Sequence, residues 1–291
     1  MQTQLMITAD DLGASPTVNS AVGLARRAGV LTTASLLVAG EAANDAILLA
    51  KDDPELAVGL HIALTRGRSV LPQEIVPDLV DEDSRFESDP IRASLKYHLE
   101  RRARRQLRIE IEAQFEAFVR TGLRLSHVDG HQHLHAHPAV LPIVVELAIR
   151  YGAHGVRVPR DPVWPNLCAD RSRIIYKLTA ALGHAYLRRV CSRSVRGSGL
   201  ATCDVVIGSL MSGRMREEYV TEMLRRVECG SVEIFFHPDE VGGDLRDPFG
   251  PNPGDLATLI SPSLKRFLEE NRFQLTSYAG LRRQEAAHAR R

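Results

Sequence analysis

Short apolar segments alternate with longer helical patterns from one end of this chain to the other. The apolar segments are rich in Val, Ile and Leu, and strands are expected near 5–9, 32–38, 56–63, 124–129, 154–158, 203–208, 232–236 and 273–277. Helices are expected near 16–28, 41–51, 105–121, 138–151, 172–190, 214–228 and 262–271. Repeated strand–helix units predict a parallel α/β sheet. Seven or eight units fit a closed or slightly incomplete (β/α) barrel, although an open doubly wound sheet has the same pattern.

The length of 291 residues suits a single domain of this class, so one domain is expected over 1–291. The strand–helix rhythm breaks near 65–100, where Pro72, Pro77, a charged DEDSR run and Pro90 occur. This segment is interpreted as a long insertion, and long loops of this kind often shape binding sites.

The charge balance and the cysteines exclude some classes of protein. The 37 basic residues are offset by 36 acidic ones, which argues against nucleic acid as the main partner. The four cysteines form no CxxC pair in a chain too large to need disulfides. The amino-terminal segment has no secretory pattern, and no run approaches the roughly 20 apolar residues of a membrane span. A soluble cytoplasmic protein is expected.

Two adjacent carboxylates, Asp10 and Asp11, directly follow the first apolar strand. Parallel α/β proteins build their sites at the carboxyl ends of strands. Consecutive side chains diverge, so one carboxylate can bind a cation while the other faces a water molecule on that cation. The alternative is a loop pair in which Asp11 caps a turn before Gly13.

Histidines follow two later strands. His61 lies near the end of LAVGLHIAL, where a hydrogen-bonded core residue is the alternative to a metal ligand. The run HVDGHQHLHAHP packs five histidines and one Asp into eleven residues. If its strand ends near Asp129, His131 is the first imidazole at the barrel mouth and can meet Asp11 and His61, while His133 lines the substrate pocket or caps the next helix. The alternative is an extended metal-binding tract of alternate histidines.

Two imidazoles and one carboxylate leave open coordination positions, which a hydrolytic metal centre requires. Asp129 is a candidate to hydrogen-bond a ligand imidazole. His237, at the end of the strand SVEIFF, is a candidate general acid, with a turn or helix-start histidine as the alternative. Arg157, at another strand end, either pairs with Asp10 and holds it ionised or forms a surface salt bridge.

The motifs ADDLG with SPTVN, VGLHIALTRGRSVLP, HVDGHQHLHAHP and FFHP, in this order, resemble the YdjC-like carbohydrate deacetylases of the ChbG/HpnK family. The resemblance runs from about residue 5 to 240. It implies an irregular, TIM-barrel-like (β/α) barrel with one divalent metal ion, Zn²⁺ or Mg²⁺. It also assigns Asp11, His61 and His131 as metal ligands, Asp10 as base and His237 as acid.

The stretch GRSVLPQEIVPDLVDEDSRF resembles the hopanoid-associated HpnK branch more than the chitooligosaccharide branch, although Asp129-Gly130 departs from it. The expected function is removal of an N-acetyl group from an N-acetylglucosamine unit, carried by a hopanoid lipid. The alternatives are a chitooligosaccharide deacetylase, another metal-dependent amidohydrolase or phosphoesterase, and a non-catalytic metal- or lipid-binding protein.

The segment 171–196 offers a separate indication about partners. From Arg171 to Cys203 there is no Asp or Glu, yet seven Arg or Lys residues are interleaved with apolar ones. A basic amphipathic helix is typical of a membrane-surface element, with a barrel helix that has a solvated basic face as the alternative. The expected partners are an acetylated amino sugar or glycolipid, with the inner membrane face and a second copy of the chain as further candidates.

Overall fold

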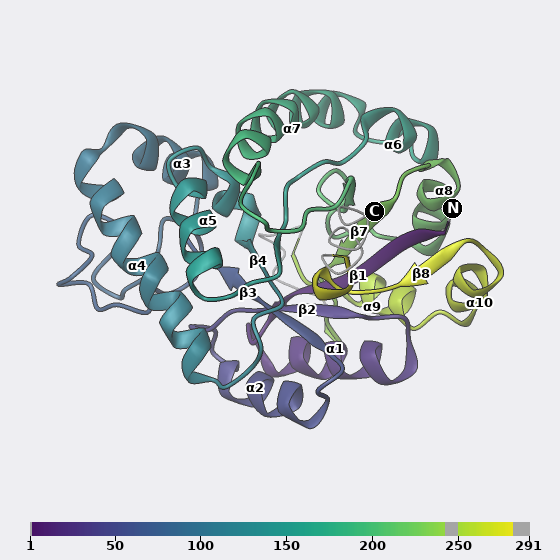
Figure 1. Ribbon diagram of the computed structural model, residues 1–291, viewed down its shortest axis with the longest axis horizontal. Coiled ribbons are helices and arrows are strands. Elements are labelled where there is room, and N and C mark those ends of the chain that lie inside the picture. Colours follow the sequence, from purple (N-terminus) through teal and green to yellow (C-terminus); the bar gives the residue numbers. More distant parts are fainter. Residues whose placement is uncertain (1, 242–249, 282–291) are drawn as a thin grey trace.

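The computed structural model describes residues 2–241 and 250–281 of the chain. Its strands form one sheet in which every pairing is parallel (Figure 1). The strands are β1 (Thr3–Leu12), β2 (Thr33–Leu36), β3 (Ala57–Ile62), β4 (His127–Gly130), β5 (Gly155–Val156), β6 (Val205–Ile207), β7 (Ser231–Phe236) and β8 (Phe273–Leu275). All eight expected strands are present, which confirms the predicted parallel sheet.

The strand order is β5-β4-β3-β2-β1-β7-β6, with β8 beside β1. The long strand β1 is paired with β7 on one edge and shares its other edge between β8, at Thr3–Leu5, and β2, from Thr8 onward. A parallel bridge between Gly155 and Ala201 links the edge strand β5 to the segment that leads into β6, the other edge strand. The sheet therefore curves into an irregular (β/α) barrel, as predicted.

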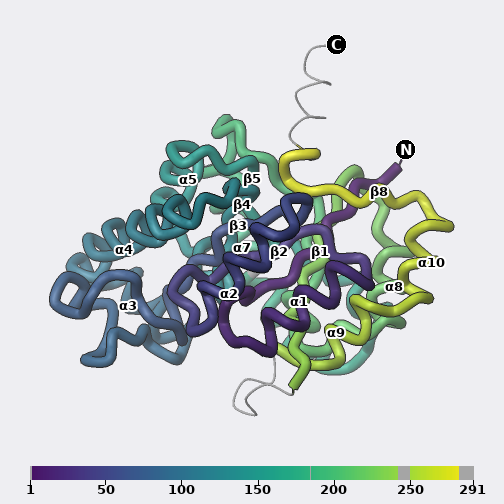
Figure 2. Tube along the Cα trace, turned by 90° about the horizontal axis from the view of Figure 1, so that it is seen from below, coloured from purple at the N-terminus to yellow at the C-terminus, as the bar shows by residue number. Residues whose placement is uncertain are grey.

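The helices lie outside the curved sheet (Figures 1 and 2). They are α1 (Pro16–Ala28), α2 (Ala43–Asp52), α3 (Pro90–Leu99), α4 (Arg101–Arg120), α5 (Leu141–Arg150), α6 (Val163–Ala169), α7 (Ile174–Val195), α8 (Glu217–Arg226), α9 (Pro253–Leu259) and α10 (Pro262–Glu270), and a 3₁₀ helix, η1, spans His131–Ala136. The seven expected helices are confirmed, and the short elements α3, α6, α9 and η1 were not expected.

Local sequence explains where these helices begin. Ser15 caps α1 by accepting a hydrogen bond from the Val18 N–H, and Pro16 occupies the first turn, where proline is tolerated. The helix expected over 138–151 begins three residues later than its expected start. Residues 137–140 form turns, and α5 begins at Leu141.

The segment 65–100, which was interpreted as a long insertion, combines an irregular stretch with one helix. Residues 65–89 lack a regular element, but the last part is the helix α3. The Asp89 carboxylate caps α3 by accepting hydrogen bonds from the N–H groups of Ile91 and Arg92, while Pro90 lies in the first turn, where proline is tolerated. The buried Glu110 on α4 holds the irregular part by accepting hydrogen bonds from the N–H groups of Val70 and Leu71.

Candidate active site

The inner face of the barrel is polar. Side chains alternate along each strand, so residues two apart share a face. On the outer face, aliphatic residues such as Leu60, Ile62 and Ile234 pack into the main core under the helices. On the inner face the strands carry Thr8 and Asp10, Thr33 and Ser35, His61, His127 and Asp129, and Glu233, all buried. Buried polar groups must satisfy one another, so this face forms one connected network.

Asp10 and Asp11 diverge at the end of β1. Asp11 has a φ of 61°, in the left-handed region that few residues other than glycine adopt. The pairing of β1 with β2 also shifts register between Ala9 and Leu12. This irregularity directs Asp11 toward His61 and His131, whereas Asp10 meets Arg157. Backbone strain of this kind is concentrated at functional sites.

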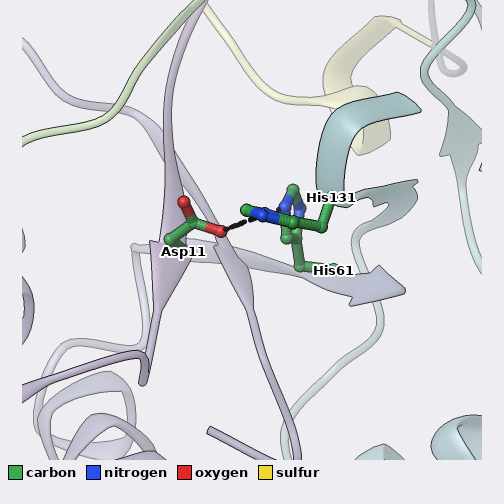
Figure 3. A group of neighbouring side chains, drawn as sticks. All are labelled: Asp11, His61 and His131. Carbon is green, nitrogen blue, oxygen red and sulfur yellow. Dashed lines mark hydrogen bonds and ion pairs between the residues drawn. The ribbon is translucent and has the colours of Figure 1, made fainter. Parts of the chain in front are cut away.

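Asp11, His61 and His131 lie together at the carboxyl ends of β1, β3 and β4 (Figure 3). Asp11 Oδ1 is 3.3 Å from His61 Nε2 and 2.9 Å from His131 Nδ1. Burial alone would raise the pKa of Asp11, but the two imidazoles hold it well below its usual value. His61 Nε2 is buried and makes no hydrogen bond. A buried, unpaired nitrogen facing a carboxylate and a second imidazole fits a divalent metal ion.

Asp129 orients the His61 ring through its Nδ1 atom. The His61 Nδ1–H donates to Asp129 Oδ1 at 2.8 Å, and the Ser35 hydroxyl donates to Asp129 Oδ2 at 2.7 Å. Burial would lower the pKa of His61, but Asp129 and Asp11 outweigh it and raise the pKa to about 10. The ring is thereby fixed with Nε2 toward Asp11, which is the arrangement predicted for Asp129.

Arg157 is the cation at the centre of the network. Its Nη1 and Nη2 donate to the two oxygens of Asp10 at 2.7 and 2.8 Å. Nη2 also lies 2.9 Å from both Asp129 Oδ2 and Glu233 Oε1. The side chain is fully buried, so the alternative of a surface salt bridge is wrong. Burial would lower the pKa of Arg157, but the three carboxylates raise it well above its usual value.

Glu233 is a member of this network that we did not expect from the sequence. It lies in the middle of β7, where Thr8 donates to Oε1 at 2.8 Å and Tyr278 donates to Oε2 at 2.7 Å. Burial would raise the pKa of Glu233, but Arg157 outweighs it, so the pKa is lowered. A single carboxylate inside the otherwise apolar run SVEIFF is the signal that identifies it.

His237 lies at the end of β7, with Nε2 4.0 Å from Asp10 Oδ2. Its side chain is 12% exposed, and its Nδ1 is 3.3 Å from the Ser212 hydroxyl. Its backbone N–H donates to the buried Asp255. His237 therefore lies beside the Asp10 carboxylate and is partly open to solvent.

The other histidines of HVDGHQHLHAHP separate after β4. Gln132 and His133 both have positive φ, so the chain turns into η1 instead of staying extended, and the alternative of an extended tract is wrong. His133 Nε2 is 3.0 Å from the Ser209 hydroxyl, and its ring meets the edge of Phe235. His135 is buried and donates from Nε2 to the Arg157 carbonyl at 2.9 Å.

His135 should make the fold acid-sensitive. Burial lowers its pKa to about 4, from 6.5, so its neutral form is favoured in the folded state. The contribution of His135 to the free energy of unfolding is fully present above pH 6.5 and is lost as the pH falls toward 4. The loss between pH 8 and pH 5 is about 2 kcal/mol. His135→Gln keeps a donor without a titrating ring. Between pH 8 and pH 5, urea unfolding should show a smaller loss of unfolding free energy in this variant than in the unmodified protein. An equal loss in both proteins would contradict the role of His135.

A comparison with known protein families covers the segments that carry these side chains. The model of the family described as YdjC-like protein matches residues 4–270, which include all the site residues above except Tyr278. This chain belongs to the YdjC-like family. The assignment agrees with the predicted resemblance and with the barrel.

Several relatives of this YdjC-like chain carry the name carbohydrate deacetylase. The one from Brevibacillus brevis is 41% identical over 284 residues, covering 96% of this chain and 99% of the relative. The one from Geobacillus stearothermophilus is 31% identical, covering 96% and 98%. A putative cellobiose-phosphate cleavage protein from Enterococcus faecalis V583 shares the fold, with a TM-score of 0.72, 24% identity and coverage of 97% and 99%.

Proposed function

We propose that this chain is a metal-dependent carbohydrate deacetylase that hydrolyses the N-acetyl group of an N-acetylglucosamine-containing substrate. The observation that carries the proposal is the divergence of two adjacent carboxylates. Asp11 meets two imidazoles, while Asp10 is held by Arg157 next to His237. The relatives named carbohydrate deacetylase support the same activity.

Asp11, His61 and His131 would hold the metal ion, since their ligand atoms lie within 4.8 Å of one another and one of them is unpaired. Two imidazoles and a carboxylate suit Zn²⁺, and other first-row ions and Mg²⁺ are the alternatives. When bound, the ion would polarise the acetyl carbonyl and make a water molecule more acidic.

The remaining groups would move protons. The Asp10 carboxylate, oriented by the two N–H groups of Arg157, would accept a proton from the attacking water. His237 would donate a proton to the departing amine nitrogen as the C–N bond breaks. Acetate and a free amino sugar would result. His133, beside Phe235, is proposed to line the sugar pocket.

For the carrier of the sugar we propose a hopanoid lipid, with a chitooligosaccharide as the alternative. The resemblance of GRSVLPQEIVPDLVDEDSRF to the hopanoid-associated branch supports this choice. Purified protein should release acetate from N-acetylated glycolipids faster than from chitooligosaccharides and should leave phosphate esters intact. Release of phosphate without acetate would refute the deacetylase, whereas preference for chitooligosaccharides would refute only the carrier.

Metal content tests the ligand set separately from turnover. Untreated protein should contain one tightly bound divalent ion per chain, and His61→Ala should lose it, because removal of a ligand leaves too few donors. His98→Ala, at an exposed histidine of α3, is the control and should keep the ion. Elemental analysis measures both. Several weakly held ions, unaffected by His61→Ala, would instead indicate metal storage.

A further inference from the structure

Helix α7 presents apolar side chains to solvent. Ile175 is 81% exposed and Leu182 is 74% exposed, and Leu178 and Tyr186 are also exposed. These residues are three or four positions apart, so they form a stripe along one side of the helix. Trp164, on the neighbouring helix α6, is 76% exposed. Exposed apolar stripes of this extent mark interaction sites on soluble domains.

The opposite side of α7 makes the contacts with the rest of the molecule. Lys177, Cys191 and Val195 are the buried residues of α7 among those described. The helix packs against α5 and α6 and runs along the rim of the molecule (Figure 1). The apolar stripe therefore faces away from the barrel and contributes nothing to its core.

The charge on this helix has one sign. No Asp or Glu occurs between Arg171 and Cys203, and the buried Lys177 is already paired with Asp170. Arg189 and Arg193 continue the line of the apolar stripe by three and four positions, and both are exposed. We call Ile175, Leu178, Leu182, Tyr186, Arg189 and Arg193 the α7 outer face. It is apolar in its first part and basic in its last.

We propose that the α7 outer face docks the protein on a lipid bilayer that contains anionic phospholipids. Apolar side chains would enter the interface while the arginines contact anionic headgroups. No described helix is long and apolar enough to cross a membrane. The inference goes beyond the proposed activity and does not depend on it.

A second copy of the chain fits this face less well. A symmetric contact through α7 would bring two sets of arginines together without an acidic partner on the helix, and like charges repel. Helix α3 also exposes apolar residues, but Asp89 and Glu100 stand at its two ends, so it lacks a uniform charge. Charge complementarity therefore favours an anionic membrane at α7.

Trp164 is the single tryptophan of the chain, so its fluorescence reports on this region alone. Trp164 lies in the first turn of α6, and α6 packs against α7, so its emission reports on the helix beside the proposed contact. Vesicles of phosphatidylcholine mixed with phosphatidylglycerol should shift its emission to shorter wavelength, and brominated lipids should quench it. Vesicles of phosphatidylcholine alone should have little effect.

Variants test the two parts of the face. Ile175→Ser with Leu182→Ser, and Arg189→Glu with Arg193→Glu, should each weaken vesicle binding at least about tenfold in sedimentation. Lys265→Glu with Arg266→Glu, on the exposed side of α10, makes the same charge change elsewhere and should bind as the unmodified protein does.

Two results would overturn the proposal. One is an unmodified chain that stays in the supernatant with both vesicle types. The other is a dimer in size-exclusion chromatography that Leu182→Ser dissociates while vesicle binding is unchanged, which would assign the face to a second copy. Both readouts are independent of acetate release, so neither result bears on the deacetylase activity.

Discussion

Asp10→Asn should lower kcat about a thousandfold while the protein keeps its metal ion. General-base catalysis contributes about 10²–10⁴-fold, and an amide cannot accept the proton from water. Asn has nearly the shape of Asp, and Arg157 keeps the carboxylates of Asp129 and Glu233, so the fold should survive. Acetate release and elemental analysis of the same sample measure the two effects.

The pH profile separates a base from a merely structural carboxylate. If Asp10 accepts the proton, the residual activity of Asp10→Asn should no longer fall on the acidic side where a base becomes protonated. Full activity in the variant would refute the base assignment. Loss of the metal together with activity would make Asp10 a ligand instead.

Arg157→Met should destabilise the protein by about 3–5 kcal/mol at neutral pH. Among the described contacts, Arg157 is the only Arg or Lys that pairs with Asp10, Asp129 and Glu233, so the substitution leaves these buried carboxylates without their guanidinium partner. Methionine fills a similar volume, so the cost reports mainly charge. Urea unfolding measures the change, and a loss below about 1 kcal/mol would contradict it.

The pH dependence of this loss has a defined sign. In the unmodified protein the pKa values of Asp129 and Glu233 are lowered, so their stabilising effect is present at neutral pH and lost as the pH falls through the folded-state values. Without the guanidinium, burial should raise these pKa values, so the two acids should gain protons at a higher pH than in the unmodified protein. The difference in the free energy of unfolding between Arg157→Met and the unmodified protein should therefore be smaller at pH 5 than at pH 7.5. Arg157→Lys keeps a positive charge, so it should lose less unfolding free energy than Arg157→Met.

The strands could be predicted because each is a short apolar run bounded by turn residues. Because parallel α/β proteins build their sites at the carboxyl ends of strands, Asp11 and His131 were expected at one end of the sheet, where the structure has them. The position of His61 came mainly from the family resemblance, since an imidazole among apolar neighbours also suits a core.

Glu233 and Tyr278 were not predicted as members of the network, although the lone carboxylate of SVEIFF marks Glu233 as unusual. Alternation indicates which residues share a face of a strand, but both faces are buried in a barrel, so it does not tell which face is inside. The path of η1 was also missed, because two consecutive left-handed residues at Gln132 and His133 have no distinctive sequence signal. For 171–196 a basic amphipathic helix was expected, either at a membrane surface or as a barrel helix with a solvated basic face, and the structure has its apolar side exposed.

Tyr278 has a consequence for the order of events during synthesis. Its ring stacks on His127, and its hydroxyl donates to Glu233. A residue near the carboxyl end of the described chain therefore packs against the buried charges. The strand β8 before it also pairs with the first strand. Domains assemble as units while the chain emerges from the ribosome. A nascent chain that ends before residue 278 therefore lacks one donor for its buried carboxylates, and the charge network can be completed only after Tyr278 has been synthesised.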